Sequence, residues 1–108
     1  MAIERTESFT RSAADVWAAL REAPEAIKSL TVKSTDEANR AITISGGMSA
    51  MTWGQNIQGT VTARGDTCEL QLIGKPKLWS AMANKRIKEL HQEIIDAIQT
   101  RLARTPNP

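Results

Sequence analysis

The chain has 108 residues, of which 41% are hydrophobic and 24% are charged, and its formal net charge at pH 7 is +2. These values are typical of one globular domain, exclude a disordered chain and do not call for a polyanionic partner. Because no apolar run reaches the length of a membrane-spanning helix and the N-terminal residues are charged, we predict a cytoplasmic protein without a membrane span.

The first elements in the chain are predicted to be a strand and a helix. Residues 3–9 alternate imperfectly between apolar and polar side chains, as in a strand with one buried face. Ser12 can cap a helix, and Asp15 favours the positive end of its dipole, so a helix is predicted over Ala13–Glu22. Pro24 makes continuation of this helix unfavourable.

A hairpin and a longer strand pair are predicted next. Ala26–Lys33 and Arg40–Ser45 are rich in Ile, Val and Thr, and the polar turn Ser34–Asn39 separates them. Residues 53–63 then place mostly apolar side chains on one face and polar or small ones on the other. A turn at residues 64–66 leads to the partner strand Thr67–Ile73, and residues 74–76 end the sheet.

The last third of the chain predicts one long amphipathic helix that starts at or just before Ser80. Its apolar stripe recurs every three or four residues, at Ala83, Ile87, Leu90, Ile94, Ile98 and Leu102. An antiparallel sheet of about five strands with one apolar face needs such a cover, which makes the fold class α+β. We predict a single domain over residues 1–103 and a disordered tail at residues 104–108.

This order of elements, together with Val16, Trp17 and Leu20 in the first helix, resembles the START-like or Bet v 1-like helix-grip superfamily. The polyketide cyclase and dehydratase branch and the lipid-transport members are included in this resemblance. It implies that the long helix grips the curved sheet and that a hydrophobic small molecule or lipid binds between them. Typical members are longer and have six or seven strands, so the alternative is a collapsed core filled by side chains such as Trp17 and Trp53.

The predicted site lies between the inner face of the sheet and the long helix. Its candidate ligand-binding residues are Phe9, Trp53, Gln55, Ile57, Leu70, Leu72, Ala83, Ile87 and Leu90. Gln55 discriminates best between a binding site and a plain core, because an amide on a covered face must find a partner. Arg5 and Glu7 share the face of Ile3 and Phe9, where they would pair.

Neither catalysis nor a metal or cofactor site is predicted. Cys68 is the only cysteine, which excludes an intrachain disulfide and a cysteine-rich zinc site, and its neighbours favour a buried, inert thiol. His91 is the only histidine, and we expect it at the surface or at the edge of the apolar stripe. Because no transferable catalytic motif is present, an enzyme is the least supported class of function.

Non-catalytic binding of a hydrophobic small molecule or lipid is the leading hypothesis, and two others stay open. A protein-interaction module or homodimer would pair through an open sheet edge, and an exposed patch of Leu78, Trp79 and Met82 would support it. Contact with an anionic lipid, or less favourably with a nucleic acid, would use a basic cluster at the start of the long helix. This basic cluster consists of Lys75, Lys77, Lys85, Arg86 and Lys88.

Overall fold

Five antiparallel strands form one sheet in the computed structural model, which describes residues 2–46 and 54–104. The strands lie in the order β1-β5-β4-β3-β2, and all four strand pairs are antiparallel. In chain order the elements are β1 (Ile3–Phe9), α1 (Ala13–Glu22), the 3-10 helix η1 (Ala23–Ala26), β2 (Leu30–Asp36), β3 (Ala41–Gly46), β4 (Gln55–Arg64), β5 (Thr67–Pro76) and α2 (Ala81–Arg104). The predicted α+β class and strand number are confirmed for the described residues.

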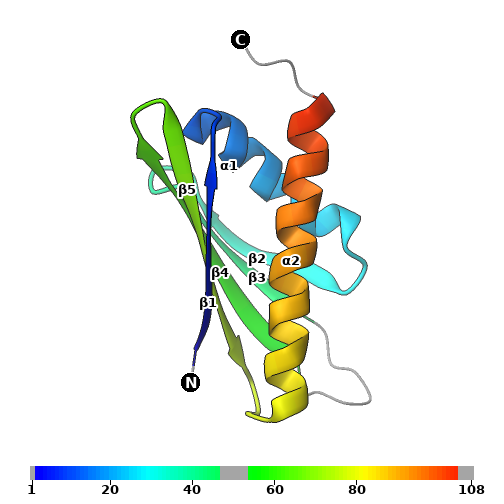
Figure 1. Cartoon of the computed structure of the whole chain (residues 1–108). Coiled ribbons are helices and arrows are strands. Elements are labelled where there is room, and N and C mark those ends of the chain that lie inside the picture. Colours follow the sequence, from blue (N-terminus) through cyan, green and yellow to red (C-terminus); the bar gives the residue numbers. More distant parts are fainter. Residues whose placement is uncertain (1, 47–53, 105–108) are drawn as a thin grey trace.

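Both α-helices cover the same face of the sheet, which gives the molecule two layers (Figure 1). Burial alternates along β4, where Ile57 and Val61 face the helices while Asn56 and Gln58 are exposed on the other face. The predicted sheet, apolar on one face and wetted on the other, is therefore confirmed. α2 is 24 residues long and runs along the molecule, with its first turns near the start of β4 (Figure 1).

Two glycines on the covered face let the helices approach the sheet. A Cβ atom on Gly59 would lie 3.3 Å from Cδ2 of Leu20, which belongs to α1. A Cβ atom on Gly74 would meet Ile87 of α2 and would lie 3.0 Å from Nε2 of His91. Because side chains at these two positions would push the helices outward, both glycines help to set the distance between the layers.

The first hairpin differs from its prediction at both ends. Ala26, the predicted start of the first strand, instead ends the 3-10 helix η1, which follows α1 directly. Pro24 is tolerated there because a proline in the first turn of a helix has no hydrogen bond to lose. The strand β2 begins only at Leu30 and continues through Asp36, so the predicted turn at residues 34–39 was too early. The observed turn is closed by Asp36, whose carboxylate accepts hydrogen bonds from the backbone and side chain of Asn39.

The predicted helix starts are confirmed by their caps. The hydroxyl of Ser12 accepts a hydrogen bond from the backbone of Asp15 at 3.1 Å, and that of Ser80 accepts one from Ala83 at 3.0 Å. α2 extends to Arg104, and the rest of the predicted tail, residues 105–108, lies outside the described residues, as does Trp53. Within the described ranges, no helix has both the length and the apolar character needed to cross a membrane.

Candidate functional site

The predicted lining residues that the structure describes are all buried between the sheet and α2. They are Phe9, Gln55, Ile57, Leu70 and Leu72 on the sheet and Ala83, Ile87 and Leu90 on the helix. The strand register and the helix periodicity thus bring together residues that lie far apart in the sequence.

The lining residues fall into two groups, one that belongs to the main hydrophobic core and one at the end of the sheet where α2 begins. Phe9, Leu70 and Leu90 belong to the same continuous hydrophobic cluster as the apolar side chains of α1. Ala83 and Ile87, in the first turns of α2, are buried but lie outside that cluster. Part of the predicted lining is therefore core, and the distinctive part lies at the end of the sheet where α2 begins.

Gln55 is the first polar group at this end. Its side chain is only 2% exposed, and its Oε1 atom has no hydrogen-bond partner among the described residues. The side chain lies against the backbone of Gly46, its partner on β3, where any Cβ atom would collide with the amide. Since buried amide oxygens are nearly always hydrogen-bonded, Gln55 is a candidate for contact with a polar group that is not part of these residues.

His91 is the second polar group, and its position corrects the sequence prediction. It was expected at the surface or at the edge of the stripe, yet it is 1% exposed and lies under α2 against Gly74. Neither ring nitrogen has a hydrogen-bond partner within the described part of the chain. Burial, and to a smaller extent the positive charge of Arg5, lowers the pKa of His91 from 6.5 to about 4, so the ring is neutral at pH 7.

A hollow of about 250 Å³ opens beside His91 at the edge of the sheet, between β1 and α2. Its walls are formed by Ile3, Glu4, Arg5, Lys88 and His91. Arg5 forms the predicted ion pair with Glu7, with 3.1 Å between Nη2 and Oε1, and it also donates a hydrogen bond to Gln92 of α2 at 3.0 Å. The pair is half-exposed at the rim, so it braces β1 against the helix and does not lie deep inside the layers.

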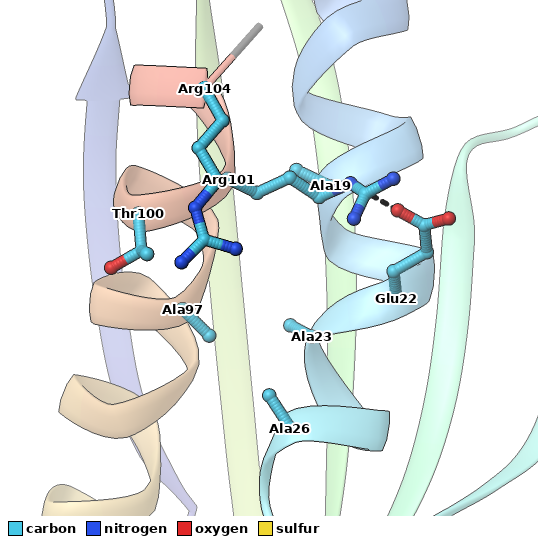
Figure 2. Close-up of a pocket in the computed structure, with 8 residues that line it drawn as sticks. All are labelled: Ala19, Glu22, Ala23, Ala26, Ala97, Thr100, Arg101 and Arg104. Atoms are coloured by element: carbon cyan, nitrogen blue, oxygen red, sulfur yellow. Dashed lines mark ion pairs between the residues drawn. The ribbon is translucent and has the colours of Figure 1, made fainter.

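A second hollow, of about 300 Å³, lies between α1, η1 and the last turns of α2 (Figure 2). Its residues are Ala19, Glu22, Ala23, Ala26, Ala97, Thr100, Arg101 and Arg104. An ion pair between Glu22 and Arg101 bridges the two helices on one side (Figure 2). The sequence prediction missed this hollow, although the closely spaced alanines were the available signal for a gap between helices.

The described residues offer few groups suited to chemistry. They contain no cluster of three or more His, Cys, Asp or Glu side chains arranged to hold a metal ion. Cys68 is buried as predicted, and desolvation raises the pKa of its thiol, which disfavours the reactive thiolate. The neutral imidazole of His91 can donate one hydrogen bond and accept another, and Oε1 of Gln55 can accept. This set suits the recognition of a neutral polar group.

Comparison with known proteins gives structural likeness only. No protein-family model matches the chain, and no curated protein sequence matches it. The START superfamily protein from Mycobacterium smegmatis is similar at a TM-score of 0.68 and 11% identity, over 97% of this chain and 99% of that one. Norcoclaurine synthase from Thalictrum flavum, in complex with dopamine and hydroxybenzaldehyde, is similar at a TM-score of 0.58 and 14% identity. This match covers 100% of this chain and 89% of that one.

A third similar structure is the di-domain ARO/CYC protein BexL from the BE-7585A biosynthetic pathway. Its TM-score is 0.74 at 11% identity, and the match covers 98% of this chain but 48% of that longer chain. All these identities are low, so the likeness establishes the arrangement of the elements and leaves activity and ligand open.

Proposed function

We propose that this chain, which has the helix-grip fold of START-like and Bet v 1-like proteins, binds a hydrophobic small molecule or lipid without catalysis. The ligand would lie between the sheet and the first turns of α2, against the predicted lining residues. The observation that carries this proposal is the pair of buried polar side chains, Gln55 and His91, whose acceptor and ring atoms lack partners among the described residues. Polar groups of a ligand that hydrogen-bond one or both of these side chains would remove the cost of burying them unpaired.

The chemistry of the two side chains narrows the class of ligand. Because His91 is neutral at pH 7, it favours a neutral hydroxyl or carbonyl group over an anion. Ile57 and Ile87, which are fully buried nearby, favour an apolar body for the rest of the ligand. Proteins of this fold bind hydrophobic ligands, and the norcoclaurine synthase complex holds two aromatic compounds.

The size of the available space sets a second condition. The hollow beside His91 is about 250 Å³, and ligand sites commonly measure about 300–1,000 Å³. A small aromatic molecule would reach His91 from the edge between β1 and α2. A lipid would also have to displace the first turns of α2, where Ala83 and Ile87 lie outside the main hydrophobic cluster.

Titration with aminoanthracene, a neutral fluorescent probe, tests this proposal. The substitution Ala83→Leu fills space under the helix and should weaken probe binding by at least about tenfold, equivalent to about 1.4 kcal/mol. Ala103→Leu, on the exposed face of the same helix, is the matched control and should leave binding unchanged. Gln55→Met serves as a second variant that does not depend on overpacking. Absence of probe binding, or binding unaffected by both inner substitutions, would overturn the proposal.

A homodimer is the second candidate, and the geometry of β2 argues against pairing through that edge. β2 is one of the two edge strands, with β1 at the opposite edge, so its free edge is a place where another chain could add. Its register with β3 shifts between Val32 and Ser34, and Lys33 lies at the shift. Bulges and lysines on edge strands are devices that prevent such pairing.

A further inference from the structure

The connection between β5 and α2 carries an exposed apolar surface. Leu78 is 55% exposed, Trp79 is 60% exposed, and Met82, in the first turn of α2, is 44% exposed. We call these three residues the apolar turn. Elsewhere in the described residues, Val32 is the one other large hydrophobic side chain that is exposed. A cluster of this kind at one site usually marks a contact surface.

The backbone of the apolar turn is held in place on both sides. The backbone amide of Lys77 donates a hydrogen bond to the carbonyl of Gly54 at 3.0 Å, which ties the connection to the start of β4. Ser80 caps α2 through its hydroxyl, and its carbonyl accepts a hydrogen bond from Asn84 at 3.0 Å. The side chains of Leu78 and Trp79 are therefore presented from a fixed connection.

The basic cluster surrounds the apolar turn in sequence. Residues 75–88 contain five basic side chains and no acidic one. Arg86 pairs with Glu93 and donates to Ser29, whereas no carboxylate of the described residues lies within ion-pair distance of Lys75, Lys77, Lys85 or Lys88. The first turn of α2 also lacks an acidic residue, so the positive end of the helix dipole adds to the positive potential of the lysines.

We infer that the apolar turn and the two exposed lysines that flank it, Lys77 and Lys85, form a docking surface for an anionic membrane. Leu, Trp and Met side chains can enter the boundary between headgroups and acyl chains, while lysines around them attract anionic headgroups. The turn lies at one end of the elongated molecule, where a flat surface can reach it (Figure 1). Nucleic acid fits less well, because single strands are held by stacked aromatic rings and the turn offers only Trp79.

This inference is independent of the proposed ligand site. Gln55 and His91 are buried under α2, whereas the apolar turn is exposed at the start of that helix. The two surfaces can therefore be changed separately. If both are functional, the membrane surface would lie beside the end of the sheet where the ligand is proposed to bind.

Co-sedimentation with vesicles tests the inference on the full chain. The protein should bind vesicles of phosphatidylcholine mixed with phosphatidylglycerol and should bind pure phosphatidylcholine weakly. Raising NaCl from about 0.1 M to about 1 M shortens the Debye length from about 10 Å to about 3 Å and should release it. Trp79→Ala should lower the partition coefficient at least about tenfold. Lys77→Gln and Lys85→Gln should each lower it about fivefold.

Matched controls lie on other parts of the surface. Val32→Ala removes an exposed apolar side chain from β2, and Lys33→Gln removes a charge from the same strand. Both should leave vesicle binding unchanged. Since all substituted residues are exposed, circular dichroism should show intact folding. Absence of vesicle binding, binding to single-stranded nucleic acid alone, or a dimer in solution that buries Trp79 would each overturn the inference.

Discussion

The imidazole ring of His91 lies against the backbone of Gly74, with Nε2 only 3.0 Å from the position that a Cβ atom would take. Gly74 lies in the middle of the sheet, since it pairs with Ile3 of β1 on one side and Ile57 of β4 on the other. The missing side chain on β5 makes the space for a histidine on α2. This contact is the reason that a polar residue of the helix becomes fully buried.

Gly74→Ala is expected to destabilise the protein because its Cβ atom would meet both Ile87 and His91. Overpacking of this kind costs about 1–3 kcal/mol of unfolding free energy. Urea denaturation measures the change, and Lys75→Ala, at the exposed neighbouring position, should stay within about 0.5 kcal/mol of the natural protein. Equal stability of the two variants would show that α2 is not packed closely on Gly74.

Stability should depend on pH through His91. Its pKa is 6.5 in the unfolded reference and about 4 in the folded protein, so between these values the unfolded state binds more protons. The free energy of unfolding is therefore unaffected by this titration above pH 6.5, and it decreases as the pH falls from 6.5 toward 4. His91→Met should reduce this loss by about 3 kcal/mol, as measured by denaturation across that range.

The same histidine can be followed directly. His91 is the only histidine in the chain, so a titration monitored by NMR has a single imidazole to observe. We expect an apparent pKa near 4, as set by burial and Arg5. A pKa near the ordinary 6.5 would mean that the ring is hydrated and that the account of its burial is wrong.

Gln55→Met should stabilise the ligand-free protein while weakening ligand binding. Methionine keeps the length of the side chain and removes the buried amide oxygen that has no partner among the described residues. We expect a gain of about 1 kcal/mol in unfolding free energy together with a loss of probe affinity. Gln58→Met, at an exposed position on the same strand, should change neither quantity. A destabilised Gln55→Met variant would instead assign the amide a structural role.

The packing of the β2–β3 hairpin against α1 should depend on the carboxylate of Glu37. Nε1 of Trp17 donates to Oε2 of Glu37 at 2.6 Å, and Arg21 pairs with Oε1 of the same group at 2.9 Å. Glu37→Ala removes the partner of a buried indole and should cost about 1 kcal/mol in thermal or urea unfolding. Glu37→Gln keeps an acceptor and should cost less. Identical losses in the two variants would contradict this assignment.

Local sequence patterns were sufficient to predict most of the fold. The stripe of α2, the caps Ser12 and Ser80, and the alternation along β4 follow from short-range periodicity and hydrogen bonding. The start of β2 was wrong because Ile27 and Leu30 are three residues apart, a spacing that fits a helical turn as well as a strand edge. Cytoplasmic location remains a prediction.

The site was harder to predict because its polar part depends on contacts between distant segments. Gln55 could be predicted from its place on the inner face of a strand. His91 could not, since its burial requires the register that places Gly74 beneath α2. The hollow between α1 and α2 likewise depends on how two helices cross, which periodicity alone does not specify.

Native mass spectrometry of the protein, purified without detergent from the cells that make it, shows whether a ligand is bound between α2 and the sheet. We predict a reproducible additional mass of a few hundred daltons that denaturing extraction releases and that Gln55→Met or Ala83→Leu reduces. If the Trp79→Ala variant retains this additional mass, the bound ligand lies away from the apolar turn. A bare protein under these conditions, with no mass gained on incubation with aminoanthracene, would contradict the claim that α2 and the sheet enclose a ligand.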